Sequence, residues 1–426
     1  MTAKTILSFF LLFSTITFSA QAQFDKYFHP KTLRFDYYHC GNHQEEEYYF
    51  DELKEEPYWG GSLRSLIDTT GYGNQFFRII DQASGKEIYS RGFCTLFNEW
   101  QTTEEAKTIR KAMPESVVFP FPKNPVRLEL YARNHKGKLE KKWAQDIDPQ
   151  SCFIRKFTPR YETMEIAYSG TPSQRVDIVL IPEGYTSNEK EKFTAACENF
   201  AKAFFSYSPY REHREHFNIR AVWAPSRESG VTLPGEHVWR NTAAKAQFYT
   251  FNSERYQMVE DFQGLRDIAA HAPYDYIYVL SNTQKYGGGG IFNFYGISAA
   301  HHPTSSDKIY VHEFGHLLLG LGDEYAGNVS YNDMYPPHVE PWEANLTTLT
   351  YFDRKEWKKM IDKNTPVPTP ATPEYANRTG VFEGGGYTSK GVYRPYQTCL
   401  MREFSTDRFC PVCTQAIVKY IRFLCQ

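Results

Sequence analysis

The chain has 426 residues and a formal net charge of −2, and 41% of its residues are hydrophobic. This length exceeds one ordinary domain, and the composition supports sizeable cores and excludes a disordered chain. The nearly balanced charge argues against broad nucleic-acid binding, which requires a basic face. We therefore expect a folded protein of more than one domain, with no nucleic-acid partner.

Residues 1–22 have the pattern of a secretory signal peptide. Lys4 supplies a positive charge, residues 6–18 are mostly apolar, and Ala20-Gln21-Ala22 is a small-x-small cleavage site. The apolar run is too short to span a membrane comfortably, and no later segment is suited to crossing one. We predict cleavage after Ala22, export to the periplasm, cell surface or medium, and no stable membrane insertion.

The eight cysteines favour disulfide bonds if the chain is exported. We expect Cys40 to pair with Cys94 near the N-terminus. The predicted C-terminal disulfide joins Cys399 to one of three later cysteines, Cys410, Cys413 or Cys425. The spacing of Cys410-Pro411-Val412-Cys413 leaves a zinc knuckle or a redox motif as alternatives.

Residues 23–150 are predicted to form an all-β sandwich. Short apolar or alternating runs at 32–38, 76–81 and 126–132 are typical of strands, and turn residues separate them. One helix is expected at 103–113. Loop signals cluster in residues 151–171, which we interpret as a linker.

Residues 172–426 are predicted to form an α/β domain with a mixed sheet. The continuous apolar run at 176–181 is typical of a central strand buried on both faces. Alternating strand and helix patterns follow, which imply crossover helices. The expected strands are 217–223 and 274–280, the expected helices are 189–206 and 256–270, and a last helix is expected at 414–424.

The central motif of this domain is His312-Glu313-Phe314-Gly315-His316. On a helix, residues four apart lie on the same face, so His312 and His316 can bind one metal ion. Two imidazoles with an open coordination position suit a catalytic Zn²⁺. Glu313 is placed to act as the general base on a water molecule that the metal activates. The helix is predicted over 309–319, buried in the centre of the domain.

A third metal ligand is expected just after this helix. Gly320 is suited to end the helix in a left-handed cap, and Asp323-Glu324 follows with two carboxylates. We favour Asp323 as the ligand. Glu324 is the alternative ligand, or else it orients a ligand histidine. A carboxylate or histidine from another helix is a further alternative.

Four glycines at 287–290 precede the metal helix, and residues 291–298 have a strand pattern. A phosphate-binding loop would need a helix after the glycines, so we exclude one here. We expect the glycines to let the chain swing into an edge strand. That strand either pairs with an extended peptide or is a plain sheet strand. Long loops at 328–396 are expected to frame a groove.

The sequence resembles the immunoglobulin A peptidase family, a metzincin-like group of exported bacterial metallopeptidases. The resemblance covers about residues 172–426, and the β-rich residues before them fit that family's usual N-terminal domain. The matching motifs are His312-Glu313-x-x-His316 with Gly320-Leu321-x-Asp323-Glu324-Tyr325, the stretches 177–185 and 287–295, Cys399-Leu400-Met401, and Cys410-Pro411-Val412-Cys413. The resemblance implies a metzincin-like fold around a central H-E-x-x-H helix, with zinc as cofactor.

In metzincins a methionine in a tight turn lies beneath the metal, and Met401 resembles that residue. The chain departs from the metzincin spacing, since Gly320 and Asp323 each lie one residue later than the pattern places them. The tyrosine expected two residues after Met401 is also missing. Three residues remain candidates to stabilise an oxyanion: Tyr325, Tyr387 and Arg402.

The sequence therefore predicts a secreted zinc endopeptidase that acts on proteins or glycoproteins. One alternative is a non-catalytic surface module that binds protein or glycan and holds a structural metal. Another is a zinc amidase that acts on cell-wall peptides. The intact Glu313 favours an enzyme, because a structural metal site has no use for that base. Cleavage of an immunoglobulin hinge is a property of some family members, and no hinge-binding surface is evident in the sequence.

Overall fold

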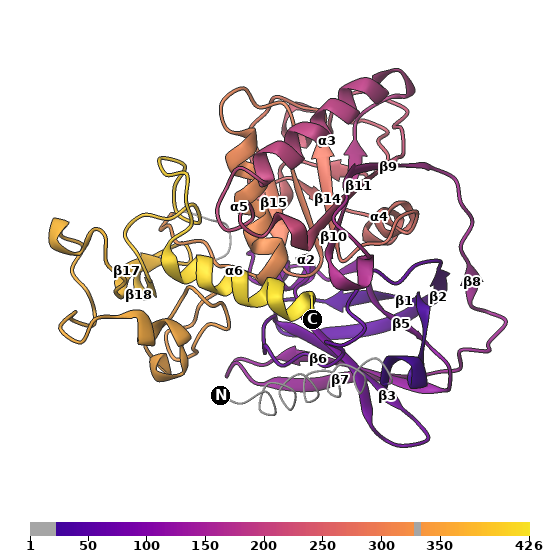
Figure 1. Cartoon of the computed structure of the whole chain (residues 1–426), viewed down its shortest axis with the longest axis horizontal. Helices are drawn as coiled ribbons and strands as arrows, with labels where there is room; N and C mark the ends of the chain where they lie inside the picture. Colours follow the sequence, from indigo (N-terminus) through magenta and orange to yellow (C-terminus); the bar gives the residue numbers. More distant parts are fainter. Residues whose placement is uncertain (1–22, 328–333) are drawn as a thin grey trace, which may run out of the picture.

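The computed structural model describes residues 23–327 and 334–426. The predicted signal peptide lies outside the described residues, as do the first six residues of the predicted loop at 328–396. The described chain has two parts, an N-terminal pair of sheets and a larger α/β part, and the two pack against each other (Figure 1).

The N-terminal part consists of two four-stranded sheets. The first has the order β5-β1-β2-β8, with β1 (Phe28–Gly41), β2 (Glu46–Glu56), β5 (Lys111–Pro122) and β8 (Arg155–Lys156). The second has the order β4-β3-β6-β7, with β3 (Gln75–Asp81), β4 (Glu87–Phe93), β6 (Val126–Arg133) and β7 (Leu139–Ile147). Phe35 of β1 shares one core with Ile79 and Leu128 of the second sheet, as in a β-sandwich.

The helix predicted at 103–113 is wrong. A short helix α2 (Leu96–Trp100) comes earlier, and only one 3-10 turn (Glu105–Lys107) lies within the predicted range. From Lys111 the chain is already in β5, where it pairs with the end of β1. Pairing across the sheet decides the conformation here, because it outweighs the weak helical preference of a short segment.

The second part contains a six-stranded sheet in the order β15-β16-β14-β10-β11-β9. The four central strands run parallel, and the two edge strands are antiparallel to their neighbours. The sheet is therefore mixed, as predicted. Its strands are β9 (Glu162–Ala167), β10 (Val176–Glu183), β11 (Phe217–Trp223), β14 (Tyr276–Ser281), β15 (Gly288–Ile291) and β16 (Tyr295–Ala299).

Helices cover both faces of this sheet (Figure 1). On β10, Ile178 and Leu180 point to one side, where they share a core with three helices, α3 (Lys190–Phe204), α5 (Ser306–Leu319) and α6 (Pro411–Leu424). Val179 and Ile181 point to the other side, towards α4 (Phe262–Ala269). This alternation explains why the run at 176–181 is apolar throughout.

The glycines at 287–290 have a different role from the one predicted. They form most of β15, and with β16 they make a hairpin rather than one strand. A Cβ atom on Gly290 would lie 2.3 Å from the backbone oxygen of Glu313. Glycine is therefore needed because α5 lies directly against β15, and the close approach fixes the distance between the helix and the sheet edge.

A charge pair and a hydrogen bond join the N-terminal sheets to the α/β part. The guanidinium of Arg34 on β1 is fully buried and contacts Asp36 at 2.7 Å and Asp267 on α4 at 2.7 Å. Gln263 of α4 also donates to the backbone oxygen of Tyr37 at 3.2 Å. The side chain of Asp267 is 54% exposed, so water screens its pair with Arg34, and this contact adds little to the stability of the interface.

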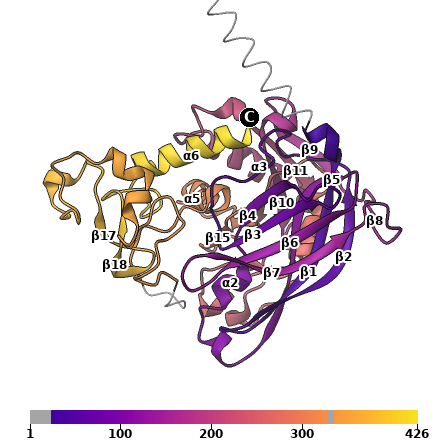
Figure 2. The same ribbon diagram turned by 90° about the horizontal axis from the view of Figure 1, so that it is seen from below.

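The chain between α5 and α6 has little regular structure and forms a lobe beside the sheet (Figure 2). Its hairpin consists of β17 (Phe382–Gly385) and β18 (Thr388–Arg394). A further small pair, β12 (Ala246–Gln247) and β13 (Met258–Val259), lies elsewhere in the α/β part. Within the described ranges, the structure contains no helix that is both long and apolar enough to cross a membrane.

All eight cysteines are free thiols, so the disulfides expected from the sequence are not formed in the structure. Cys40 lies on β1 in the first sheet, whereas Cys94 follows β4 of the second sheet. The backbone of Cys94 donates to Phe292 of the α/β part at 2.9 Å, which turns this residue towards the domain boundary. The cysteines near the C-terminus are described below.

Candidate metal centre

The two motif histidines lie one turn apart on α5, and both face a cleft. The helix ends where the sequence places its cap. Gly320 has φ +65° and ψ 43°, the left-handed conformation, and its amide donates to the backbone oxygen of His316 at 2.8 Å. A side chain at this position would collide with Trp342. The turn at Gly320 redirects the chain so that Asp323 returns to the histidines.

Three ligating atoms form a nearly equilateral triangle. The Nε2 atoms of His312 and His316 are 3.2 Å apart, and Asp323 Oδ1 lies 3.2 Å from the first and 3.4 Å from the second. A tetrahedral ion with bonds of about 2.1 Å separates its ligands by about 3.4 Å. Asp323 Oδ1 is buried and accepts no hydrogen bond. The donor set and its unsatisfied oxygen therefore fit a metal ion.

Neighbouring charges shift the pKa values of these groups in metal-free protein. Burial lowers the pKa of His316, but the charge and hydrogen bond of Asp323, with smaller effects from Glu313 and the backbone of Leu321, together raise that pKa to about 9. The pKa of His312 is raised in the same way. Burial opposes ionisation of Asp323, yet the two histidines hold its pKa well below the usual range. The carboxylate is thus charged at neutral pH, and a proton competes with a metal for the histidines.

Backbone carbonyl groups orient both imidazoles. The Nδ1 atom of His312 lies 2.9 Å from the oxygen of Leu400, and Nδ1 of His316 contacts the oxygen of Leu321. A carbonyl oxygen only accepts, so each Nδ1 carries a proton, and in the neutral imidazole each Nε2 presents its lone pair to the triangle.

Tyr387 holds Asp323 in place, a role that no sequence pattern indicated. Its hydroxyl donates to Asp323 Oδ2 at 2.5 Å, and the amide of Gly386 donates to the backbone oxygen of Asp323 at 2.8 Å. Tyr387 lies in the turn between β17 and β18 with φ +66°. A bulky residue in this conformation is strained, and such strain is typical of functional sites.

Glu313 lines the cleft beside the histidines and is half-buried. Its carboxylate lies within 4.8 Å of ligating atoms of His312 and His316. Burial raises the pKa of Glu313, although the charges of the histidines oppose the rise. A carboxylate with a raised pKa is a stronger base, which suits proton transfer near neutral pH.

Met401 lies beneath the histidine helix. The amide of Arg402 donates to the oxygen of Cys399 at 2.9 Å, so Met401 occupies a tight turn. Its side chain is fully buried. A Cβ atom on Gly315, which stands between the two histidines in sequence, would lie 2.9 Å from Met401 Sδ. The glycine in the motif therefore makes room for this methionine.

Glu324 points away from the histidines. Its carboxylate contacts Cys413 Sγ at 3.1 Å and receives a hydrogen bond from Asn345 Nδ2 at 3.0 Å. Of the residues singled out from the sequence, the structure thus gathers His312, Glu313, His316 and Asp323 around one point, with Met401 below, and it places Glu324 elsewhere.

The cleft has a volume of about 1070 Å³, and both parts of the chain line it. The N-terminal part contributes Thr95, Asn98 and Glu99, from α2 and the residue before it. Burial raises the pKa of Glu99 to about 7, against a hydrogen bond from the hydroxyl of Tyr256 that lowers it. Sequence patterns gave no hint that these residues reach the site, because the contact depends on how the two parts pack.

The geometry of the site defines a class of protein. A buried helix with two histidines and a glutamate, a nearby carboxylate and an open cleft form the type of site found in metal-dependent hydrolases. Residues 164–376 and 371–421 match the model of the IgA Peptidase M64 family, and residues 23–144 match its Peptidase M64 N-terminus. The chain belongs to the IgA peptidase M64 family. It is therefore a metallopeptidase with protein or peptide substrates. No curated protein matches the chain.

Proposed function

We propose that this protein is an exported zinc endopeptidase that hydrolyses peptide bonds in protein or glycoprotein substrates. The observation that carries the proposal is the triangle of His312 Nε2, His316 Nε2 and Asp323 Oδ1 at the floor of an open cleft. Two nitrogens and one oxygen that leave a position open towards solvent match the ligand sets of catalytic zinc sites.

Each residue around the triangle has a defined part in this proposal. A Zn²⁺ ion bound there would activate a water molecule and polarise the scissile carbonyl group. Glu313 would take a proton from the attacking water and pass it to the leaving amine. Tyr387 would keep Asp323 oriented through its hydrogen bond. Because that hydroxyl already binds Asp323, we favour Tyr325 and Arg402, which also line the cleft, as groups that stabilise an oxyanion.

The arrangement supports a metzincin-like reading of the catalytic domain, which we propose to extend over residues 172–426. Its supports are the left-handed turn at Gly320, the ligand just after it and the methionine turn below the histidines. We keep residues 23–150 as the N-terminal sandwich domain and 151–171 as the linker. In the structure, two strands lie within that linker: β8 pairs with β2 of the first sheet, and β9 pairs with β11 of the six-stranded sheet.

The edge strand β15 suits recognition of an extended substrate. It forms both the edge of the sheet and one wall of the cleft, and its glycines carry no side chains. The amide of Gly288 already contacts the oxygen of Arg255 at 3.3 Å. We therefore propose that a substrate backbone pairs with the part of β15 beyond Gly288.

Export rests on the sequence of residues 1–22, and N-terminal sequencing of protein recovered outside the cytoplasm tests it. A mature chain that begins at Gln23 supports cleavage after Ala22. Recovery only inside the cytoplasm with an intact N-terminus would overturn the proposal of export.

The catalytic proposal is tested by zinc content and by cleavage of a mixed peptide library, for the wild type and for Glu313→Ala. We expect cleavage by the wild type only, with zinc bound in both proteins. Cleavage that survives Glu313→Ala would overturn the mechanism. Full zinc occupancy without cleavage of any peptide or protein would favour the binding module, and cleavage confined to cell-wall peptides would favour the amidase.

A further inference from the structure

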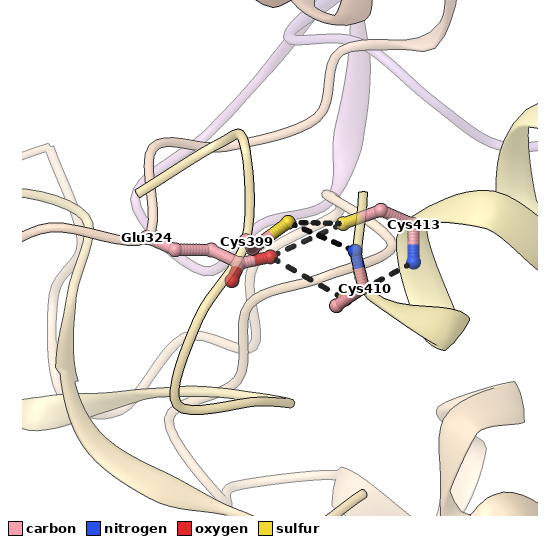
Figure 3. Close-up of side chains that lie close together, drawn as sticks. All are labelled: Glu324, Cys399, Cys410 and Cys413. Carbon is pink, nitrogen blue, oxygen red and sulfur yellow. Dashed lines mark hydrogen bonds between the residues drawn. The ribbon is translucent and has the colours of Figure 1, made fainter. Parts of the chain in front are cut away.

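A second group of ligating side chains lies close to the histidine site, and the proposed function does not use it. Glu324, Cys399, Cys410 and Cys413 are all buried, and one ligating atom from each lies within 4.8 Å of the others. They come from three segments, namely the loop after α5, the turn that contains Met401, and the start of α6. Figure 3 shows the four side chains converging on one point.

Backbone amides donate to two of these sulfur atoms, those of Cys399 and Cys410. Cys410 is the residue that caps α6, and its Sγ accepts from the amide of Cys413 at 3.4 Å. Cys399 Sγ accepts from the amide of Cys410 at 3.2 Å. Donors that point at sulfur favour the thiolate over the thiol, and the thiolate is the form that binds metals. The Cys-x-x-Cys spacing at a helix start is also typical of structural zinc sites.

The buried carboxylate of Glu324 has the environment of a metal ligand. Its Oε1 lies 3.1 Å from Cys413 Sγ, 3.9 Å from Cys410 Sγ and 3.0 Å from Asn345 Nδ2. Its Oε2 is buried without a hydrogen-bond partner. Across residues 23–327 and 334–426, no ion pair with Glu324 is formed. A buried carboxylate without a cation is costly, and a metal ion would remove that cost.

The spacing fits one tetrahedral ion. The Sγ atoms of Cys399 and Cys413 are 3.9 Å apart. An ion with Zn–S bonds of about 2.3 Å separates two sulfur ligands by about 3.8 Å, and a sulfur from an oxygen by about 3.5 Å. The two sulfur–oxygen distances at Glu324 Oε1, 3.1 and 3.9 Å, lie on either side of that value.

We propose that Glu324, Cys399, Cys410 and Cys413 form a structural zinc site, separate from the histidine site. Three thiolates and one carboxylate complete a tetrahedron and leave no open position, which is the mark of a structural site. Each thiol that binds the ion releases its proton to solvent, and no oxidation is involved.

This site would position the floor of the histidine site. Glu324 directly follows Asp323, and Cys399 lies two residues before Met401. The amide of Glu324 also donates to the oxygen of Met401 at 2.8 Å, which ties the two segments together. A zinc ion at the cysteines would therefore fix the positions of Asp323 and of the turn that contains Met401 relative to α6.

Metal stoichiometry of the purified full chain tests the proposal. With the histidine site also loaded, elemental analysis should find two zinc ions per wild-type chain. Cys410→Ser and Cys413→Ser should each lose one zinc, while Cys152→Ser, which changes an exposed cysteine, should lose none. His316→Ala should lose the other zinc and keep the sulfur-bound one. An unchanged zinc content in both cysteine variants would overturn the proposal.

A measurement on cobalt-substituted protein covers the case in which the cysteine variants do not fold. Cobalt bound by thiolates has an ultraviolet charge-transfer band that cobalt bound by nitrogen and oxygen lacks. We expect this band in the wild type and in His316→Ala. Its absence in both, or a Cys399–Cys413 disulfide found by peptide mapping without reductant, would overturn the proposal. If the thiolate band is present but no zinc binds at the histidines, the cysteine site is supported and the catalytic proposal is contradicted.

Discussion

Two groups of ligating side chains lie on either side of a single peptide bond, between Asp323 and Glu324. The first joins Asp323 to His312 and His316 at the floor of an open cleft. The second joins Glu324 to three cysteines and is closed to solvent. Nitrogen and oxygen ligands with an open position suit chemistry, whereas sulfur-rich closed sets suit structure. Burial and ligand type, rather than position in the sequence, separate the two roles.

The largest effect should come from removing each of these two carboxylates in turn. Asp323→Ala should cost more than about 100-fold in zinc affinity at the histidines, because loss of an outer partner alone costs 10–100-fold. Glu324→Ala should retain zinc at the histidines and lose it at the cysteines. Site-resolved metal analysis of the two variants, alongside peptide cleavage, measures this. If Glu324→Ala stripped the histidine site more than Asp323→Ala did, the ligand assignment would be wrong.

Acidification should weaken zinc binding at the histidine site. In metal-free protein the pKa of His316 is raised above its ordinary value, to about 9. A proton therefore competes with zinc below pH 9, and binding releases that proton. The apparent zinc affinity of the histidine site should fall by about tenfold for each pH unit between 9 and 7. Competition with a chelator at several pH values measures the slope, and a flat profile over this range would contradict the prediction.

A smaller effect is expected at the hydrogen bond that orients Asp323. Tyr387→Phe removes the donor to Asp323 Oδ2 and should weaken zinc binding at the histidines by about 10–100-fold. The cysteine site should be unaffected. Tyr393→Phe, on the adjoining strand β18, is the matched control and should leave both affinities unchanged. Equal losses in the two variants would point to general damage to the hairpin.

The smallest effect should come from Glu99, a residue of the N-terminal part that lines the cleft. Burial raises the pKa of Glu99 to about 7, so the carboxyl group is neutral below that pH and charged above it. Cleavage of peptides with basic residues should therefore improve as pH rises through 7, by a few-fold in KM at constant kcat. Glu99→Gln should abolish this gain, whereas Glu104→Gln, at an exposed position, should not. If the KM of Glu99→Gln for these peptides still improves as pH rises through 7, Glu99 does not contribute to substrate binding.

The sequence was informative wherever a function depends on residues close together in the chain. The histidine motif, the turn at Gly320 and the strand at 176–181 follow from local spacing and composition, and the structure contains the corresponding helix, cap and strand. The cap is predictable because only a residue tolerant of positive φ fits there.

Contacts between distant segments could not be predicted. Tyr387 reaches Asp323 across 64 residues, and Glu99 reaches the cleft only because the two parts of the chain pack together. The helix expected at 103–113 failed for the same reason, since the end of that segment, from Lys111, pairs with β1. The cysteines were assigned to disulfides from their number and expected compartment. Their gathering around a carboxylate depends on the turn that brings Cys399 to the start of α6.

The segment that carries Asp323 and Glu324 is extended and runs beside the turn at Gly386 and Tyr387. Successive side chains of an extended segment point in opposite directions. Inserting or deleting one residue after Gly320 would therefore turn the aspartate towards the cysteines and the glutamate towards the histidines, so both sites would be misassembled together. Substitution is tolerable at many positions of a loop, but the length of this one is fixed.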